Sequence, residues 1–215
     1  MGQMRKIVHQ SDRDAWLEAR KNYVTASDAV VALGLSKYQT REELVLSKLG
    51  QWERPDTRGP EARELGLLLE AGLAAMVRKL WGWPVDEFGW LVECKRQPLL
   101  AATPDMVMQT PWGPAVVDMK VTSAMAQEDC KPRRDGAASA ARFSSGCPID
   151  YAAQLQAQMA CLGPEYKWGA ILALHTMSGG EPKMRAYPVR RNESVILEIE
   201  DAVAEVMAEV KERAK

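Results

Sequence analysis

The chain has 215 residues and a formal net charge of −1, with 47% hydrophobic and 27% charged residues. These proportions are ordinary for a globular protein, and the length predicts one domain over residues 1–215. No apolar run is long enough to cross a bilayer and the N-terminus lacks a signal-peptide pattern, so we expect a cytoplasmic protein without membrane contact.

The positions of the cysteines and of the charged residues narrow the possible classes of protein further. The cysteines at positions 94, 130, 147 and 161 form no C-x-x-C pair, which favours reduced thiols over a zinc site or a disulfide framework. Residues 131–142 hold four basic and one acidic side chain, whereas residues 193–215 hold seven acidic and three basic ones. A near-neutral total can therefore hide a cationic working surface.

Three helices are expected before residue 51, over residues 12–21, 24–34 and 40–50. The first has its start signal at Ser11, and the second is capped by Thr25 or Ser27. The third begins with a capping box of Thr40 and Glu43.

The remainder predicts a sheet with helices on either side. A markedly apolar helix is expected over residues 61–81, followed by strands over roughly 87–94, 99–108 and 115–121. A long aperiodic loop over 124–148 then precedes a helix over 150–163, strands over 168–175 and 184–190, and an amphipathic helix over 193–213. This order predicts an α/β fold with a mixed, mainly antiparallel central sheet flanked by helices.

Charged side chains stand within the predicted strands. Asp118 and Lys120 are two residues apart, so they share one face of a strand while Met119 points to the other. Asp105 lies on the strand before them and can lie opposite them through the turn "QTPWGP". Spacing alone leaves two interpretations open: a solvated face with an Asp–Lys surface pair, or a site that needs these charges.

A metal site would explain the charges. Carboxylates that converge, with Glu70 of the apolar helix as a third, repel unless a divalent cation neutralises them, and oxygen ligands suit Mg²⁺ or Mn²⁺. A lysine beside such a cation can orient a water or stabilise phosphoryl charge. That set is typical of metal-assisted phosphodiester hydrolysis.

Five motifs, in order along the chain, carry a family resemblance. They are "DAWLEARKNYVTASDAVVALGLSKYQTREELVLSKLG", "ELGLLLEAGLAAMV", "ATPDMV", "VVDMKV" and "DYAAQLQAQMACLG". Over about residues 14–163 the sequence resembles the phage lambda exonuclease and YqaJ family of viral recombination nucleases. The resemblance implies the PD-(D/E)xK fold, which has a restriction-endonuclease-like core.

The resemblance assigns roles to individual residues. Metal ligands are implied at Asp105, at Asp118, at the backbone carbonyl of Met119 and, directly or through water, at Glu70. Lys120 is the motif lysine that helps to activate the attacking water. Gln154 is expected to support Lys120 or that water, and Gln156 is the less favoured glutamine. Asp118 stands where many relatives have Glu, so its shorter side chain changes how the cation is reached.

Arg20 and Ser27 match the family's pocket for the 5′ phosphate of a DNA end. The chemistry suits them, because a guanidinium forks onto phosphate and the start of a helix offers free N–H groups. Lys131, Arg133 and Arg134 fit contact with the DNA backbone, although a solvated flexible loop explains them equally well.

The implied function is a Mg²⁺-dependent exodeoxyribonuclease, with Mn²⁺ able to substitute, that degrades one strand of linear double-stranded DNA from 5′ to 3′. The resemblance also implies a ring-shaped homotrimer that binds double-stranded DNA ends, a single-strand annealing protein as partner, and a phage or prophage source in a bacterial cell. No P-loop is present, so ATP is not expected. The alternatives are an endonuclease or RecB-like repair nuclease, and a DNA-end-binding module without catalysis.

Overall fold

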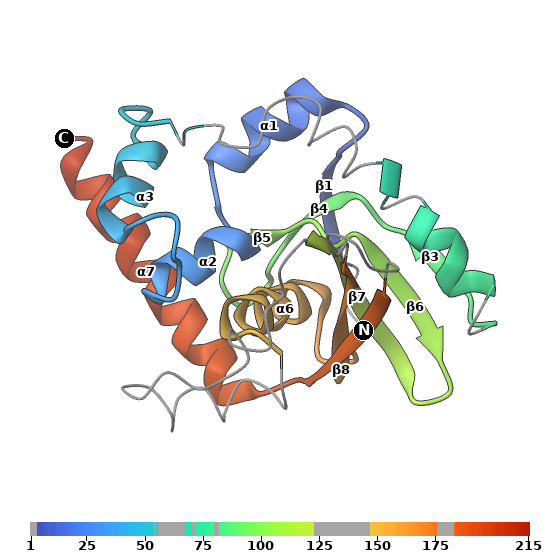
Figure 1. The fold of residues 1–215 in the computed structure, drawn as a ribbon. Helices are drawn as coiled ribbons and strands as arrows, with labels where there is room; N and C mark the ends of the chain where they lie inside the picture. The colour runs from blue at the N-terminus through green and yellow to red at the C-terminus, as the bar shows by residue number, and fades with distance from the viewer. Residues whose placement is uncertain are drawn as a thin grey trace.

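The computed structural model describes residues 4–53, 55, 68–69, 72–79, 82–122, 147–175 and 183–215. Its strands form two sheets with helices packed around them (Figure 1). The first sheet has the strand order β1 (Arg5–His9), β4 (Trp90–Glu93), β5 (Leu100–Ala102) and β2 (Val24–Thr25). The second has the order β3 (Val85–Glu87), β6 (Met106–Thr110), β7 (Gly113–Thr122), β8 (Trp168–His175) and β9 (Lys183–Arg190).

Most neighbouring strands are antiparallel, which agrees with the mixed, mainly antiparallel arrangement predicted from the sequence. The pairs β2–β5 and β7–β8 are parallel. A parallel pair needs a long crossover, and α6 (Ile149–Leu162) lies in the connection between β7 and β8. The sequence predicted a central sheet, and the structure divides its strands between two sheets.

The division occurs at Pro104, within the run predicted as one strand over 99–108. Proline has no N–H to donate and is poorly tolerated inside a sheet, so β5 ends before it and β6 begins after it in the other sheet. The run predicted over 87–94 divides at the same level, between β3 and β4, where Gly89 has a positive φ of 55°. The carbonyl of Pro104 accepts a 3.2 Å hydrogen bond from the Gly89 amide. The two sheets therefore diverge around one pair of crossing segments.

The first helix, α1 (Arg13–Lys21), begins one residue later than expected. Its N-cap is Asp12, whose side chain accepts a 3.2 Å hydrogen bond from the Ala15 amide. Ser11, predicted as the start, instead contacts the ring of His9 at 2.8 Å.

The next two helices have the caps that the sequence indicated. Thr25, one of the two candidates, caps α2 (Ala26–Ala32) and forms a capping box with Asp28. Thr40 and Glu43 form the capping box of α3 (Arg41–Lys48), as predicted. In both boxes the cap hydroxyl and the later carboxylate satisfy amides that would otherwise lack partners.

The second sheet buries both of its faces. One face packs against α6, which in turn packs against α7 (Glu193–Arg213), and the other face packs against helical residues 72–79, part of the helix predicted over 61–81. Side chains alternate along β7: Val116 belongs to the first cluster, whereas Val117 and Met119 belong to the second. Asp118 and Lys120 therefore share the face that α6 covers.

The loop predicted over 124–148 lies outside the described residues except for its last two positions. Within the described ranges, no helix is both long enough and apolar enough to cross a membrane.

Close packing of β8 against β7 gives a stability prediction. A Cβ on Gly169 would lie 2.7 Å from both the carbonyl oxygen and a methyl of Val116, and 3.4 Å from a methyl of Leu155. We expect Gly169→Ala to lower the free energy of unfolding by about 1–3 kcal/mol, measured by urea denaturation. Gly72→Ala is the matched control, because a Cβ there meets no described atom within 4 Å. Equal denaturation midpoints for the two variants would contradict the packing.

Candidate active site

Asp105 and Asp118 meet where the two sheets diverge. Asp118 lies on β7 with its side chain 2% exposed. The sequence predicted Asp105 on a strand, but Asp105 lies in the bend between β5 and β6. Its Oδ2 accepts a 2.7 Å hydrogen bond from the Met119 amide. This bond holds the crossing segment against β7 and brings the two carboxylates together.

Lys120 forms an ion pair with Oδ2 of Asp118, on the shared strand face that the spacing predicted. Its ammonium also lies 5.6 Å from the centre of the Tyr151 ring. Burial by itself would lower the pKa of the Lys120 ammonium, but the negative charges of Asp118 and Asp105 outweigh it and raise that pKa above the ordinary lysine value. Lys120 is therefore a cation at neutral pH.

Two glutamines of α6 hold the other oxygen of Asp118. Oδ1 accepts a 2.9 Å hydrogen bond from Gln158 Nε2 and a 3.2 Å hydrogen bond from Gln154 Nε2. Gln154 was expected near this site, whereas Gln158 was missed. The helical period could have predicted Gln158, because it lies four residues after Gln154 and residues four apart share one helix face.

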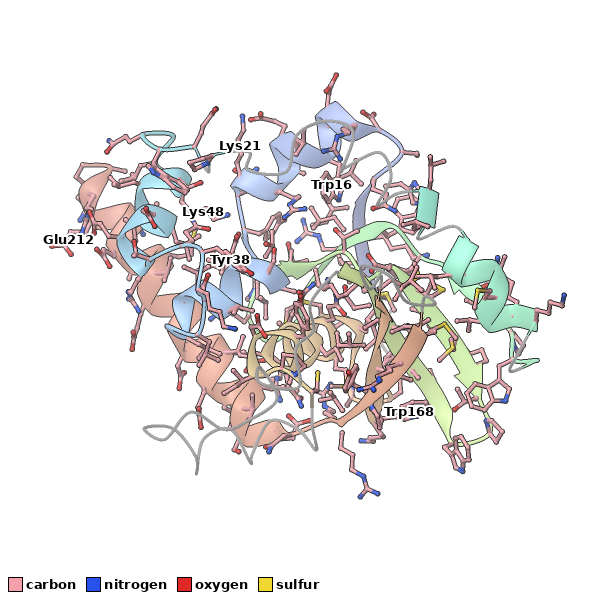
Figure 2. All side chains as sticks on the ribbon, in the orientation of Figure 1. Trp16, Lys21, Tyr38, Lys48, Trp168 and Glu212 are labelled. Atoms are coloured by element: carbon pink, nitrogen blue, oxygen red, sulfur yellow. The ribbon has the colours of Figure 1, made fainter. Side chains whose placement is uncertain are left out.

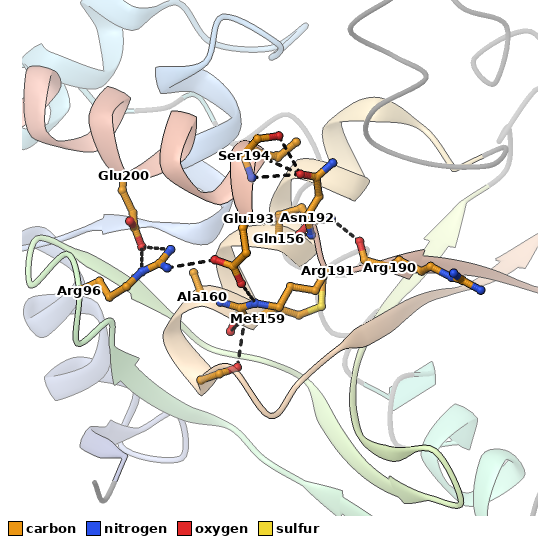
Figure 3. A network of polar contacts seen from close by, with 12 residues as sticks. Arg96, Gln156, Met159, Ala160, Arg190, Arg191, Asn192, Glu193, Ser194 and Glu200 are labelled. Atoms are coloured by element: carbon orange, nitrogen blue, oxygen red, sulfur yellow. Dashed lines mark hydrogen bonds and ion pairs between the residues drawn. The ribbon is translucent and has the colours of Figure 1, made fainter. Parts of the chain in front are cut away.

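Gln156, the less favoured glutamine, points to the opposite side of α6. Its Nε2 donates to the Arg190 carbonyl at 2.7 Å, and its Oε1 accepts from the Asn192 amide at 3.0 Å (Figure 3). A residue two positions along a helix is rotated by about 200°, which removes it from the face of Gln154. Gln156 joins α6 to the connection between β9 and α7.

The predicted phosphate residue Arg20 is linked to the same crossing segment. Its guanidinium carbon lies 4.2 Å from the centre of the Trp16 ring, and Trp16 Nε1 donates a 3.0 Å hydrogen bond to Thr103 Oγ1. Thr103 is two residues before Asp105. Burial lowers the pKa of Arg20, and the charge of Asp28 opposes that effect. The structure thus places Arg20 against the Trp16 ring, which is hydrogen-bonded to the segment that carries Asp105.

Ser27 is exposed in the first turn of α2, and its hydroxyl lies 3.0 Å from that of Thr25. Its neighbour Asp28 interacts electrostatically with Arg20, which brings both predicted phosphate residues to one region. The other predicted site residues lie outside the described residues: Glu70, Lys131, Arg133 and Arg134.

The described side chains fit a hard divalent cation. Both candidate ligands are carboxylates, and the buried Oδ2 of Asp118 contacts the positive charge of Lys120. In the described part of the chain, no third acidic, histidine or cysteine side chain joins them. Two carboxylates suit Mg²⁺, which commonly keeps several waters and uses one or two protein carboxylates.

Comparison with known proteins identifies the family. The two-sheet core is a mixed α/β fold, and residues 15–165 match the YqaJ-like viral recombinase domain. The chain therefore belongs to the YqaJ-like viral recombinase family. It is 28% identical over 158 residues to the uncharacterized protein YqaJ of Bacillus subtilis (strain 168). The aligned region covers 74% of this chain and 45% of that protein. The chain thus spans less than half the length of this relative.

Solved structures share the fold. The alkaline exonuclease LHK-Exo from Laribacter hongkongensis superposes with a TM-score of 0.65 at 20% identity, covering 93% of each chain. Its complex with dAMP gives a TM-score of 0.66 at 22% identity, with the same coverage. A phage-related exonuclease from Haemophilus somnus 129PT gives 0.63 at 14% identity, covering 89% of this chain and 95% of that one. These similarities confirm the predicted fold class.

The raised pKa of Lys120 predicts a pH dependence of stability. Because the folded pKa exceeds the unfolded one, the ion pair stabilises fully below the ordinary lysine pKa of about 10.4 and loses its effect as pH rises through the folded value. Lys120→Met should cost about 3 kcal/mol at pH 7, because it leaves Asp118 buried without its cation. We expect this cost to stay constant to about pH 10 and to shrink above it, measured by urea denaturation. A cost that already falls between pH 7 and pH 9 would contradict the assignment.

Proposed function

We propose that this protein is a Mg²⁺-dependent exodeoxyribonuclease, with Mn²⁺ able to substitute, that degrades one strand of linear duplex DNA from 5′ to 3′. The observation that carries the proposal is the convergence of Asp105, Asp118 and Lys120 at the divergence of the sheets, with Arg20 linked to the same segment through Trp16. The exposed 3′ strand would then be available for strand annealing.

The proposed chemistry divides between the cation and the chain. Asp105 and Asp118 would hold the cation, together with the Met119 carbonyl and Glu70, and the bound cation would polarise the scissile phosphate and acidify water. Gln154 and Gln158 fix Oδ1 of Asp118, so Oδ2 keeps one orientation. Lys120 carries a positive charge at neutral pH, so it supplies N–H donors to a phosphate that gains charge in the transition state.

The proposed polarity follows from the end-binding residues. Arg20 can form charge-assisted hydrogen bonds to a 5′ phosphate, and its fixed platform reaches Thr103, two residues from Asp105. An end held there presents its first phosphodiester to the carboxylates. Support also comes from LHK-Exo, which has been crystallised with dAMP, a nucleoside monophosphate of the kind an exonuclease releases.

The proposed assembly and partner rest on family membership. A ring-shaped homotrimer would enclose the duplex and keep the protein on one strand. A single-strand annealing protein would bind the 3′ strand, and Lys131, Arg133 and Arg134 would contact the DNA backbone. The setting would be the cytoplasm of a bacterial cell, and no ATP would be needed.

The decisive test is digestion of end-labelled linear duplexes with a 5′ phosphate or a 5′ hydroxyl, beside a covalently closed circle. We expect Mg²⁺-dependent release of mononucleotides from linear DNA, faster with the 5′ phosphate, and none from the circle. Asp118→Asn should remove the activity, because it deletes a charged ligand but little packing. Cleavage of the circle would indicate an endonuclease. Metal-independent binding without release of nucleotides would indicate an end-binding module.

Gln158 gives a test of the metal site that needs no turnover. Gln158→Met keeps most of the side-chain volume but removes a hydrogen bond to Oδ1 of Asp118. Loss of such a supporting contact commonly weakens metal binding about 10–100-fold, which calorimetry with Mn²⁺ would measure. Gln109→Met, on the exposed side of β6, is the matched control and should bind like the parent. Unchanged Mn²⁺ affinity in folded Gln158→Met would remove Gln158 from the site.

A further inference from the structure

A second nearly buried ion pair lies between α2 and α3, beside the proposed phosphate residues. Lys48 Nζ is 2.8 Å from Asp28 Oδ2, and the two side chains are 9% and 20% exposed. Figure 2 shows Lys48 on α3 next to α2, with Trp16 and Lys21 on the neighbouring α1. The same Asp28 oxygen accepts a 3.0 Å hydrogen bond from the Thr25 amide. Asp28 is therefore fixed in position by two donors.

This carboxylate creates an electrostatic problem for an end-binding site. Asp28 directly follows Ser27 in the chain, and its charge acts on Arg20. A free carboxylate there would attract the guanidinium and repel an incoming phosphate. At separations of several ångströms near a protein surface, one such unit charge changes an equilibrium constant by about tenfold or more.

We propose that Lys48 neutralises Asp28 and so leaves the charge of Arg20 available for the 5′ phosphate of a DNA end. The inference rests on the proposed end-binding function of Arg20 and Ser27, and it makes Lys48 a positioning residue that sets the preference for phosphorylated ends. Lys48 acts through Asp28 rather than on DNA itself, because its ammonium faces the carboxylate and its side chain is almost fully covered.

Helix capping alone does not account for the pair. Asn at position 28 could accept the hydrogen bond from the Thr25 amide without carrying a charge, and it would not need a lysine on α3. Removing two charges from water is costly, and a buried ion pair generally stabilises a fold no better than apolar side chains of similar size. The pair does, however, place a compensated carboxylate beside Arg20, which matches a role in ligand selectivity.

The test measures binding without catalysis. Fluorescence anisotropy in EDTA would compare blunt duplexes with a 5′ phosphate and a 5′ hydroxyl for the parent, Lys48→Met and the double variant Lys48→Met with Asp28→Asn. We expect Lys48→Met to lose about tenfold in the ratio of the two affinities, since Asp28 is then uncompensated. The double variant should regain the parent ratio, because Asn keeps an acceptor for the Thr25 amide but has no charge.

Lys21→Met is the matched control, because Lys21 is an exposed lysine of α1 paired with Glu18. It should weaken binding to both duplexes alike and leave their ratio unchanged. Arg20→Ala tests the pocket itself and should abolish the preference in every background.

The outcomes separate the two proposals. A parent ratio of one would overturn the end-binding pocket and, with it, the role of Lys48. A clear parent ratio that Lys48→Met keeps, or that the folded double variant does not regain, would overturn the role of Lys48 alone; the second result would make Lys48 a direct phosphate anchor. If Lys48→Met fails to fold, the double variant decides by itself: the parent ratio supports the inference and a lost ratio overturns it.

Discussion

The hydrogen bond from the Met119 amide to Asp105 Oδ2 is the contact on which the site depends. Asp105 belongs to the segment that crosses between the sheets, and Met119 belongs to the strand that carries Asp118 and Lys120. The bond therefore joins the segment between the two sheets to a strand of the second sheet. The same crossing segment carries Thr103, which accepts from Trp16 and so positions the platform of Arg20. One short stretch of backbone thus connects the proposed cleavage and end-binding residues.

Compensated charge is common to both regions. Asp118 and Asp28 are carboxylates with little exposure, and each is paired with a lysine from a neighbouring position or helix. Each also accepts hydrogen bonds that fix its orientation, from the α6 glutamines in one case and from a capped helix start in the other. Carboxylates held in this way keep a fixed geometry, which suits them to select cations or anions beside them.

Local sequence signals predicted much of the chain. The capping boxes at Thr40 and, with one alternative, at Thr25 were readable because a cap needs only residues three positions apart. The shared face of Asp118 and Lys120 followed from the strand period. The division into two sheets was missed, because the apolar runs on either side of Pro104 have the same composition whichever sheet they enter.

The sequence by itself determined, through its motifs, the family to which the chain belongs, and it predicted the residues that are proposed to carry the chemistry. Only the tertiary structure decided how they meet. It placed Asp105 in a bend rather than on a strand, and it showed that Gln158 donates a hydrogen bond to Asp118. It also showed that Gln156 lies on the opposite side of α6 and that Lys48 pairs with Asp28 in the region of Arg20. These relations join residues from 14 to 40 positions apart. Propensity and periodicity report only on near neighbours in the chain, whereas such contacts depend on how whole elements pack.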